Sequence, residues 1–253
     1  MKYKGISTQA IGMACGCNSS TKQASHEGGA DLGRRGFMRN TLASTFVLLA
    51  GAAVTRPRPA SAQTTLTPDE ALTAMMDGNE RYVAGQLESL DEDLSILKAK
   101  TAEKQEPFAA VLSCADSRVP VELVFDQSIG HLFVVRVAGN VTTPEITASL
   151  EYGVAVLGTK LLMVLGHSNC GAVKAAIEGK EVPGQISALY APIRPAVDVA
   201  GPNLDAVVDA NAKIQATLLS KASPIIAEAI KEGNLKVVPA RYDIASGKVT
   251  LLA

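Results

Sequence analysis

The sequence lacks an apolar run long enough to cross a membrane. The candidate segment, residues 41–54, is uncharged but shorter than the roughly 18–20 apolar residues that a spanning helix needs. It follows a twin-arginine pattern at Arg34 and Arg35 and precedes the small residues 60–62. A basic region, an apolar region and a small-residue cleavage site in this order predict a cleaved signal peptide of the twin-arginine type over residues 1–62.

The predicted mature chain, residues 63–253, lacks a basic run. Eight of the 24 Lys and Arg residues and two of the 25 Asp and Glu residues lie in the leader, which leaves 16 basic and 23 acidic residues and a net charge of about −7. An acidic surface argues against nucleic acid and anionic lipid as partners. The length fits one domain with a proper core. We therefore expect one periplasmic or secreted domain, with no membrane anchor after cleavage.

Cysteine is also scarce. Cys15 and Cys17 belong to the predicted leader, so only Cys114 and Cys170 remain in the mature chain. Two cysteines in an oxidising compartment would ordinarily suggest a disulfide. The twin-arginine route, however, exports proteins that are already folded and suits metals loaded in the cytoplasm. Metal ligation is therefore the favoured interpretation.

The mature chain alternates apolar runs with helical patterns. Because the runs are continuous rather than alternating, they indicate strands that are covered on both faces. A capping box at Thr67 opens the first helix, and a hairpin near residue 247 predicts an edge strand. This order predicts an α/β fold, a mainly parallel sheet of about four strands with an antiparallel edge strand, flanked by helices. The expected strands are residues 108–113, 132–138, 161–165 and 235–240, and the expected helices include 143–157, 171–178 and 204–231, with a further exposed helix within 91–106.

Two short motifs carry the chemistry. The first is CADSR at residues 114–118, and the second is HSNC at residues 167–170. Each motif follows a predicted strand, and the carboxyl ends of neighbouring parallel strands open into one crevice. Two thiols, an imidazole and a carboxylate form a complete ligand set for tetrahedral zinc. The predicted ligands are Cys114, His167 and Cys170, with Asp116 or water in the fourth position.

Arg118 indicates whether Asp116 or water takes the fourth ligand position of the zinc ion. A carboxylate held by a bidentate guanidinium pairs with the arginine instead of the metal. The free position then holds water, whose pKa zinc lowers to near 7, so a zinc-bound hydroxide forms at neutral pH. This reasoning predicts a zinc hydrolase or hydratase without naming its substrate. A closed site with Asp116 bound permanently would instead make a non-catalytic zinc-binding protein.

The two motifs resemble those of the β-class carbonic anhydrases. Further matches lie at residues 78–82, 133–140 and 242–244, so that the resemblance covers nearly the whole mature chain. The resemblance implies reversible hydration of CO2 to bicarbonate and a proton, with one Zn²⁺ per chain. It also implies that Asp116 binds zinc in a closed state and pairs with Arg118 in the active one.

The same resemblance implies substrate-binding residues and partners. Gln127 stands where many relatives carry a glutamine that hydrogen-bonds bicarbonate. Gly139 is expected to line the pocket, where its missing side chain would leave room. The family places its active site at a dimer interface, so we expect a homodimer or a dimer of dimers.

The sequence departs from its relatives at two points. It has no tryptophan, so the bicarbonate regulatory pocket that uses one in some relatives is not formed that way. His131 replaces a residue that is usually acidic; we interpret it as a surface loop residue, with a proton shuttle as the alternative. The motifs do not separate CO2 hydration from hydrolysis of CS2 or COS on the same scaffold.

Overall fold

The computed structural model describes residues 64–89 and 94–253. The chain divides into two units, Met1–Arg56 and Pro57–Ala253, and every described residue belongs to the second. The predicted signal peptide with its cleavage site lies outside the described residues. Within the described part, no helix is long and apolar enough to cross a membrane.

A five-stranded sheet with the order β2-β1-β3-β4-β5 forms the centre of the domain. The first four strands pair in parallel and β5 pairs with β4 in antiparallel fashion, as predicted. Every residue of β1 and β3 is buried, which explains why both read as continuous apolar runs. The strands are β1 Ala109–Ser113, β2 Leu132–Arg136, β3 Leu161–His167, β4 Lys236–Tyr242 and β5 Val249–Leu251.

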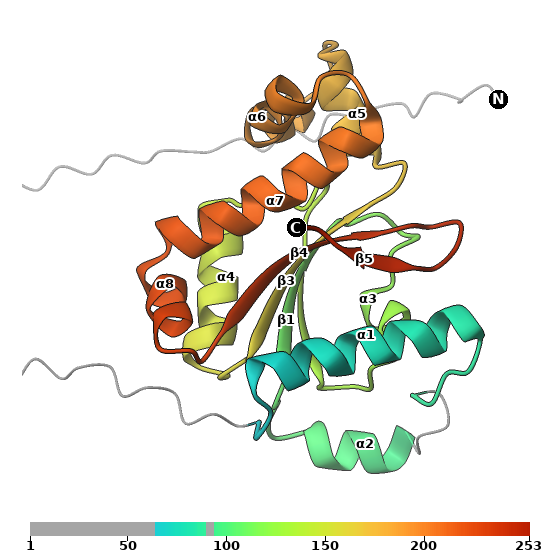
Figure 1. Cartoon of the computed structure of the whole chain (residues 1–253), viewed down its shortest axis with the longest axis vertical. Helices are drawn as coiled ribbons and strands as arrows, with labels where there is room; N and C mark the ends of the chain where they lie inside the picture. Colours follow the sequence, from blue (N-terminus) through green and yellow to red (C-terminus); the bar gives the residue numbers. More distant parts are fainter. Residues whose placement is uncertain (1–63, 90–93) are drawn as a thin grey trace, which may run out of the picture. The chain divides into compact units, whose positions relative to one another are not determined.

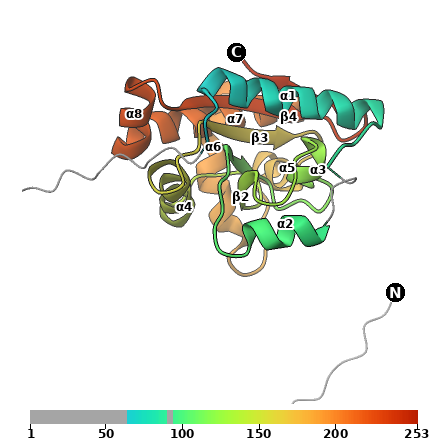
Figure 2. The same ribbon diagram turned by 90° about the horizontal axis from the view of Figure 1, so that it is seen from below.

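Helices cover both faces of this sheet (Figure 1). Helices α1 (Pro68–Ala84) and α3 (Val121–Val124) pack on one face, whereas α4 (Pro144–Ala155), α7 (Leu204–Ala222) and α8 (Pro224–Lys231) pack on the other. A third apolar cluster joins α5 (Gly171–Glu178) and α6 (Tyr190–Ala200) to α7 beyond the carboxyl ends of the strands. The view from below in Figure 2 shows α1 lying along the β3 and β4 side of the sheet.

The predicted helices differ from the observed ones in three respects. The stretch 204–231 is two helices, because Ser223 ends α7 and caps α8, whose first residue is Pro224. Of the exposed stretch 91–106, the described residues form a helix only at α2 (Leu94–Thr101). Helix α6, which contains an internal proline, the short α3, and the 3-10 helix η1 (Ile186–Leu189) were not predicted.

Three residues of helix α1 join it to α3, to the two residues that follow α3 and to the turn between β4 and β5. An added Cβ at Gly78 would lie 1.9 Å from the carbonyl oxygen of Phe125, so only glycine fits this contact. Asn79 donates to the carbonyls of Val124 and Gly247, and Arg81 binds Asp126 at 2.6 Å. The resemblance at residues 78–82 therefore has a structural basis.

Asp126 is the buried partner in this contact. Its side chain is fully buried, and it accepts hydrogen bonds from Arg81 and from the backbone N–H groups of Glu88 and Ser89. Burial raises the pKa of this carboxyl, but the hydrogen bonds from Ser89, Arg81 and Glu88 outweigh that effect and hold the pKa at about 2. The folded state therefore stabilises the ionised form of Asp126.

Asp126→Asn is expected to lower the free energy of unfolding by about 2 kcal/mol at pH 7. Because the folded-state pKa is depressed, the contribution is complete above about pH 5 and disappears as the pH falls toward 2. Urea unfolding of metal-free protein at pH 7 and pH 3 measures the difference, which should shrink at the lower pH. Asp198→Asn, which removes an exposed ion pair with Arg194, is the control and should change little. A difference independent of pH would contradict the assignment.

Candidate metal centre

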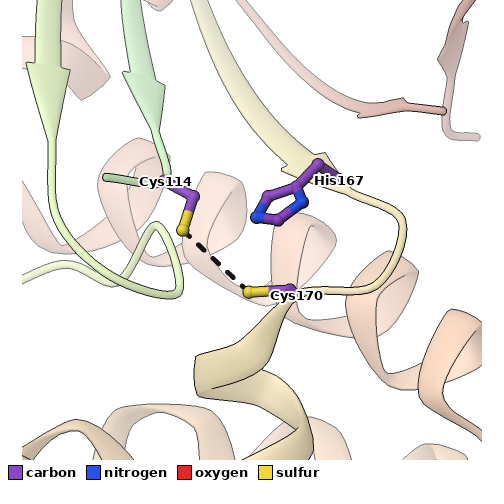
Figure 3. Close-up of side chains that lie close together, drawn as sticks. All are labelled: Cys114, His167 and Cys170. Atoms are coloured by element: carbon purple, nitrogen blue, oxygen red, sulfur yellow. Dashed lines mark hydrogen bonds between the residues drawn. The ribbon is translucent and has the colours of Figure 1, made fainter. Parts of the chain in front are cut away.

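Three predicted ligands meet beyond the carboxyl ends of β1 and β3. Cys114 directly follows β1, His167 ends β3, and Cys170 caps the start of α5. Because β1 and β3 are neighbours in the sheet, the two motifs lie side by side. The two sulfurs and a ring nitrogen of His167 lie within 4.8 Å of one another and point toward a common centre (Figure 3).

The tautomer of His167 leaves one nitrogen available to a metal. Its Nδ1 lies 2.9 Å from the carbonyl oxygen of Ser168, which can only accept, so Nδ1 carries the proton. Nε2 then presents a lone pair, and this atom is buried without a hydrogen-bond partner. A buried acceptor without a partner, beside two sulfurs, fits a zinc ion as the missing partner.

The two cysteines are free and almost completely buried. Their sulfurs are 4.0 Å apart, about twice the length of a disulfide bond. The hydrogen bond from Cys170 lowers the pKa of Cys114 most, and the N–H of Gly139 lowers it further, against the effect of burial. The same hydrogen bond, together with burial, raises the pKa of Cys170. The two thiols thus differ in acidity, and a divalent cation bound between them would favour the loss of both protons.

Asp116 is held by Arg118. The guanidinium donates from Nε and Nη2 to the two carboxylate oxygens at 2.9 and 2.8 Å, and the backbone N–H of Arg118 adds a third bond of 2.9 Å. The hydrogen bonds from the Arg118 side chain hold the pKa of Asp116 well below its usual range. One carboxylate oxygen lies 3.9 Å from Nε2 of His167. Asp116 is therefore next to the three ligands but paired with the arginine.

Gly139 lies next to the proposed ligands and contacts one of them through its backbone. Its backbone N–H donates to the sulfur of Cys114 at 3.3 Å. An added Cβ would lie 2.9 Å from Ile193 and 3.3 Å from Ala172, so these side chains already occupy the space beside the glycine. The glycine therefore permits close packing and a contact with the sulfur of Cys114, and its place in the substrate pocket stays a prediction.

The side chain of Gln127 hydrogen-bonds its own loop and helix α1. Its amide nitrogen donates to the carbonyl of Phe125 at 2.9 Å and to that of Ala74 at 3.5 Å. These two contacts fix its side chain next to Gly78. Its role in bicarbonate binding stays a prediction.

His131 lies at the amino ends of the parallel strands, whereas the proposed ligands lie at their carboxyl ends. It precedes the first residue of β2, whereas the register pairs the last residue of that strand, Arg136, with Ser113, next to Cys114. The five residues of β2 separate these two ends of the strand by roughly 16 Å. His131 is exposed, with its ring 6.2 Å from that of Phe108. The placement agrees with a surface loop residue and speaks against the proton shuttle.

Two further residues support the ligands and were not recognised from the sequence as functional. Arg136 donates to the backbone carbonyls of Cys114 and Asp116 at 2.9 and 2.6 Å. Ser168 orients His167 through its carbonyl oxygen, and its hydroxyl accepts from the N–H of Ile244 at 3.0 Å. Both residues lie inside the matched motifs, but only the folded contacts reveal what they do.

Comparison with known proteins agrees with this geometry. A family model described as carbonic anhydrase matches residues 109–249. Carbonic anhydrase 2 of Mycobacterium tuberculosis is 34% identical over 192 residues, covering 73% of this chain and 92% of the relative. A carbonic anhydrase of Mycolicibacterium smegmatis is 36% identical over 192 residues, with 73% and 93% covered.

Solved structures of β-carbonic anhydrases have the same fold. The Coccomyxa enzyme in complex with acetazolamide has a TM-score of 0.56 and 31% identity, covering 63% of this chain and 78% of that one. A tetrameric enzyme of Sordaria macrospora has a TM-score of 0.57 and 28% identity, covering 61% and 85%. The motifs, the ligand geometry and these relatives agree: the chain belongs to the β-class carbonic anhydrases.

Proposed function

We propose that this protein catalyses the reversible hydration of CO2 to bicarbonate and a proton, with one zinc ion held by Cys114, His167 and Cys170. The observation that carries the proposal is a buried group of three ligands whose neighbouring carboxylate is engaged by an arginine. When bound, zinc would acidify a coordinated water so that it can attack CO2 near neutral pH.

Neighbouring residues orient the proposed ligands and hold Asp116 in place. The N–H of Gly139 hydrogen-bonds the Cys114 sulfur, and the carbonyl of Ser168 keeps the proton of His167 on Nδ1. Arg118 keeps the carboxylate of Asp116 paired, which leaves the fourth position of a tetrahedral site to solvent. This arrangement favours the active state of the proposed Asp116 gate over the closed one.

The assembly and the location of the protein are also proposed. A homodimer or a dimer of dimers is supported by the tetrameric Sordaria relative. Export by the twin-arginine route, cleavage after Ala62 and a periplasmic or secreted location rest on the leader sequence. N-terminal sequencing of the exported protein and its molar mass in solution test these two proposals.

The test of the activity is stopped-flow CO2 hydration combined with metal analysis. We expect fast hydration by protein that holds one zinc per chain, loss of activity after chelation and recovery on adding zinc. Rates with CS2 and COS, measured side by side, should be far lower than the rate with CO2. Zinc-loaded protein that hydrates no CO2 at pH 7 or pH 8.5 would contradict the proposal, and rapid turnover of CS2 or COS would redirect it to that hydrolysis.

A further inference from the structure

Helix α7 presents two buried amides, Asn211 and Gln215, to the loop that follows β2. Their side chains are 1% and 0% exposed. Asn211 donates to the carbonyl of Gly139 at 2.9 Å, while Oε1 of Gln215 accepts from the N–H of Thr142 at 2.9 Å and from its hydroxyl at 2.7 Å. Gln215 also donates to Asn211 at 3.2 Å. One pair of side chains on one helix thus binds the loop at two points, Gly139 and Thr142.

The same pair connects the loop to helix α6. Gln215 donates to the carbonyl of Pro192 at 3.0 Å, and the next residue, Ile193, packs against Gly139. Gly139 has a φ of +79°, a conformation that only glycine adopts readily. The loop is therefore fixed from the side of α7 by hydrogen bonds and from the side of α6 by packing.

The loop matters because Gly139 touches a proposed metal ligand. Its N–H donates to the sulfur of Cys114, and its carbonyl, on the next peptide group, accepts from Asn211. Burying two amides in a core is unfavourable unless their polar atoms are bonded. Here the two amides bond to the loop, to each other and to the carbonyl of Pro192. These bonds offset the cost of burying them and fix the position of Gly139.

We propose that Asn211 and Gln215 are positioning residues that hold the N–H of Gly139 on the sulfur of Cys114 and thereby strengthen metal binding. This inference rests on the proposed zinc centre. Groups that orient a ligand or hydrogen-bond it change metal affinity typically by 10- to 100-fold. The pair acts through Gly139 and touches neither the metal nor the substrate.

Asn211→Leu tests the proposal, because leucine has a similar shape but donates no hydrogen bond. We expect zinc affinity, measured by competition with a chromophoric chelator, to fall about 10-fold. In the cobalt-substituted protein, we expect the thiolate-to-cobalt charge-transfer band to move to longer wavelength, since a sulfur that loses a hydrogen bond gives up its electrons more easily. Unchanged affinity and an unchanged band would overturn the proposal.

Leu219→Ala is the matched control for a general loss of stability. Leu219 is buried on the same helix but packs into the cluster against the sheet. This variant should lower Tm while leaving zinc affinity and the cobalt band unchanged; if it reproduces both changes, the proposal fails. Where Asn211→Leu does not fold, Thr142→Val, which removes one hydrogen bond to Gln215, should produce the same shifts in smaller size, and their absence overturns the proposal. Failure of the unaltered protein to bind zinc or cobalt tightly would overturn the metal centre and this inference together.

Discussion

Replacing Arg118 by methionine is expected to lower kcat/KM for CO2 hydration about 100-fold at neutral pH, with the zinc content unchanged. The arginine makes three hydrogen bonds to Asp116, and one oxygen of that carboxylate already lies 3.9 Å from Nε2 of His167. Without the guanidinium, the carboxylate is free to occupy the position that water needs. A 100-fold loss corresponds to about 2.7 kcal/mol, which is the size expected for losing hydrogen bonds to a charged group.

The conservative variant refines this test. Arg118→Lys keeps the charge, but a single ammonium group does not span both oxygens of Asp116, so we expect an intermediate loss. Arg194→Met, which removes an exposed ion pair on α6, is the matched control and should retain full activity. Stopped-flow assays and metal analysis of the three variants decide the matter: full activity in Arg118→Met would rule out the gate.

The second large effect is expected at Gly78 and concerns stability. Alanine in place of glycine normally stabilises a helix by about 1 kcal/mol. At Gly78 the added Cβ would lie 1.9 Å from the carbonyl oxygen of Phe125 and 2.8 Å from its carbon, and a backbone group has little room to move. We expect Gly78→Ala to lower the free energy of unfolding by about 3 kcal/mol and Tm by about 10 °C.

Gly153→Ala is the matched control for this prediction. Gly153 also lies in a helix, but the atoms nearest to its added Cβ all belong to the side chain of Phe133, the first at 3.1 Å, and a ring can shift by a few tenths of an ångström. Its Tm should stay within about 3 °C of the unaltered protein. Thermal unfolding of both variants measures the contrast, and equal Tm values would show that α1 adjusts more easily than its contacts indicate.

Much of the fold could be predicted because parallel strands covered on both faces have a simple sequence pattern. Strands β1 and β3 are continuous apolar runs, and polar residues with metal-binding chemistry stand at their carboxyl ends. The sequence did not show that these two strands are neighbours, because that depends on the order of all the strands. The break at Ser223 was missed although Ser-Pro is a common helix start, since the apolar pattern continues on both sides of it.

The supporting contacts were less accessible to prediction. Asn211 meets Gly139 across 72 positions of sequence, and its amide lies in a helix whose pattern explains only the apolar residues. The motif includes Gly139, but the two reasons for a glycine there, its φ of +79° and its contact with Ile193 of the unpredicted helix α6, depend on the tertiary fold. A motif identifies which residues act, whereas the groups that hold them depend on the tertiary fold.

The placement of the proposed ligands at the carboxyl ends of two neighbouring strands has a consequence for how the protein folds. Cys114 and Cys170 are 56 positions apart, and the chain runs through β2 and α4 before β3 can pair with β1. Pairing of this non-local kind is intrinsically slow. A chain in which these strands have not yet paired has no assembled centre to offer, so zinc would bind after the rate-limiting step. In the proposed enzyme the metal would therefore prolong the lifetime of the native state by slowing unfolding, while the topology of the sheet would set the rate of folding.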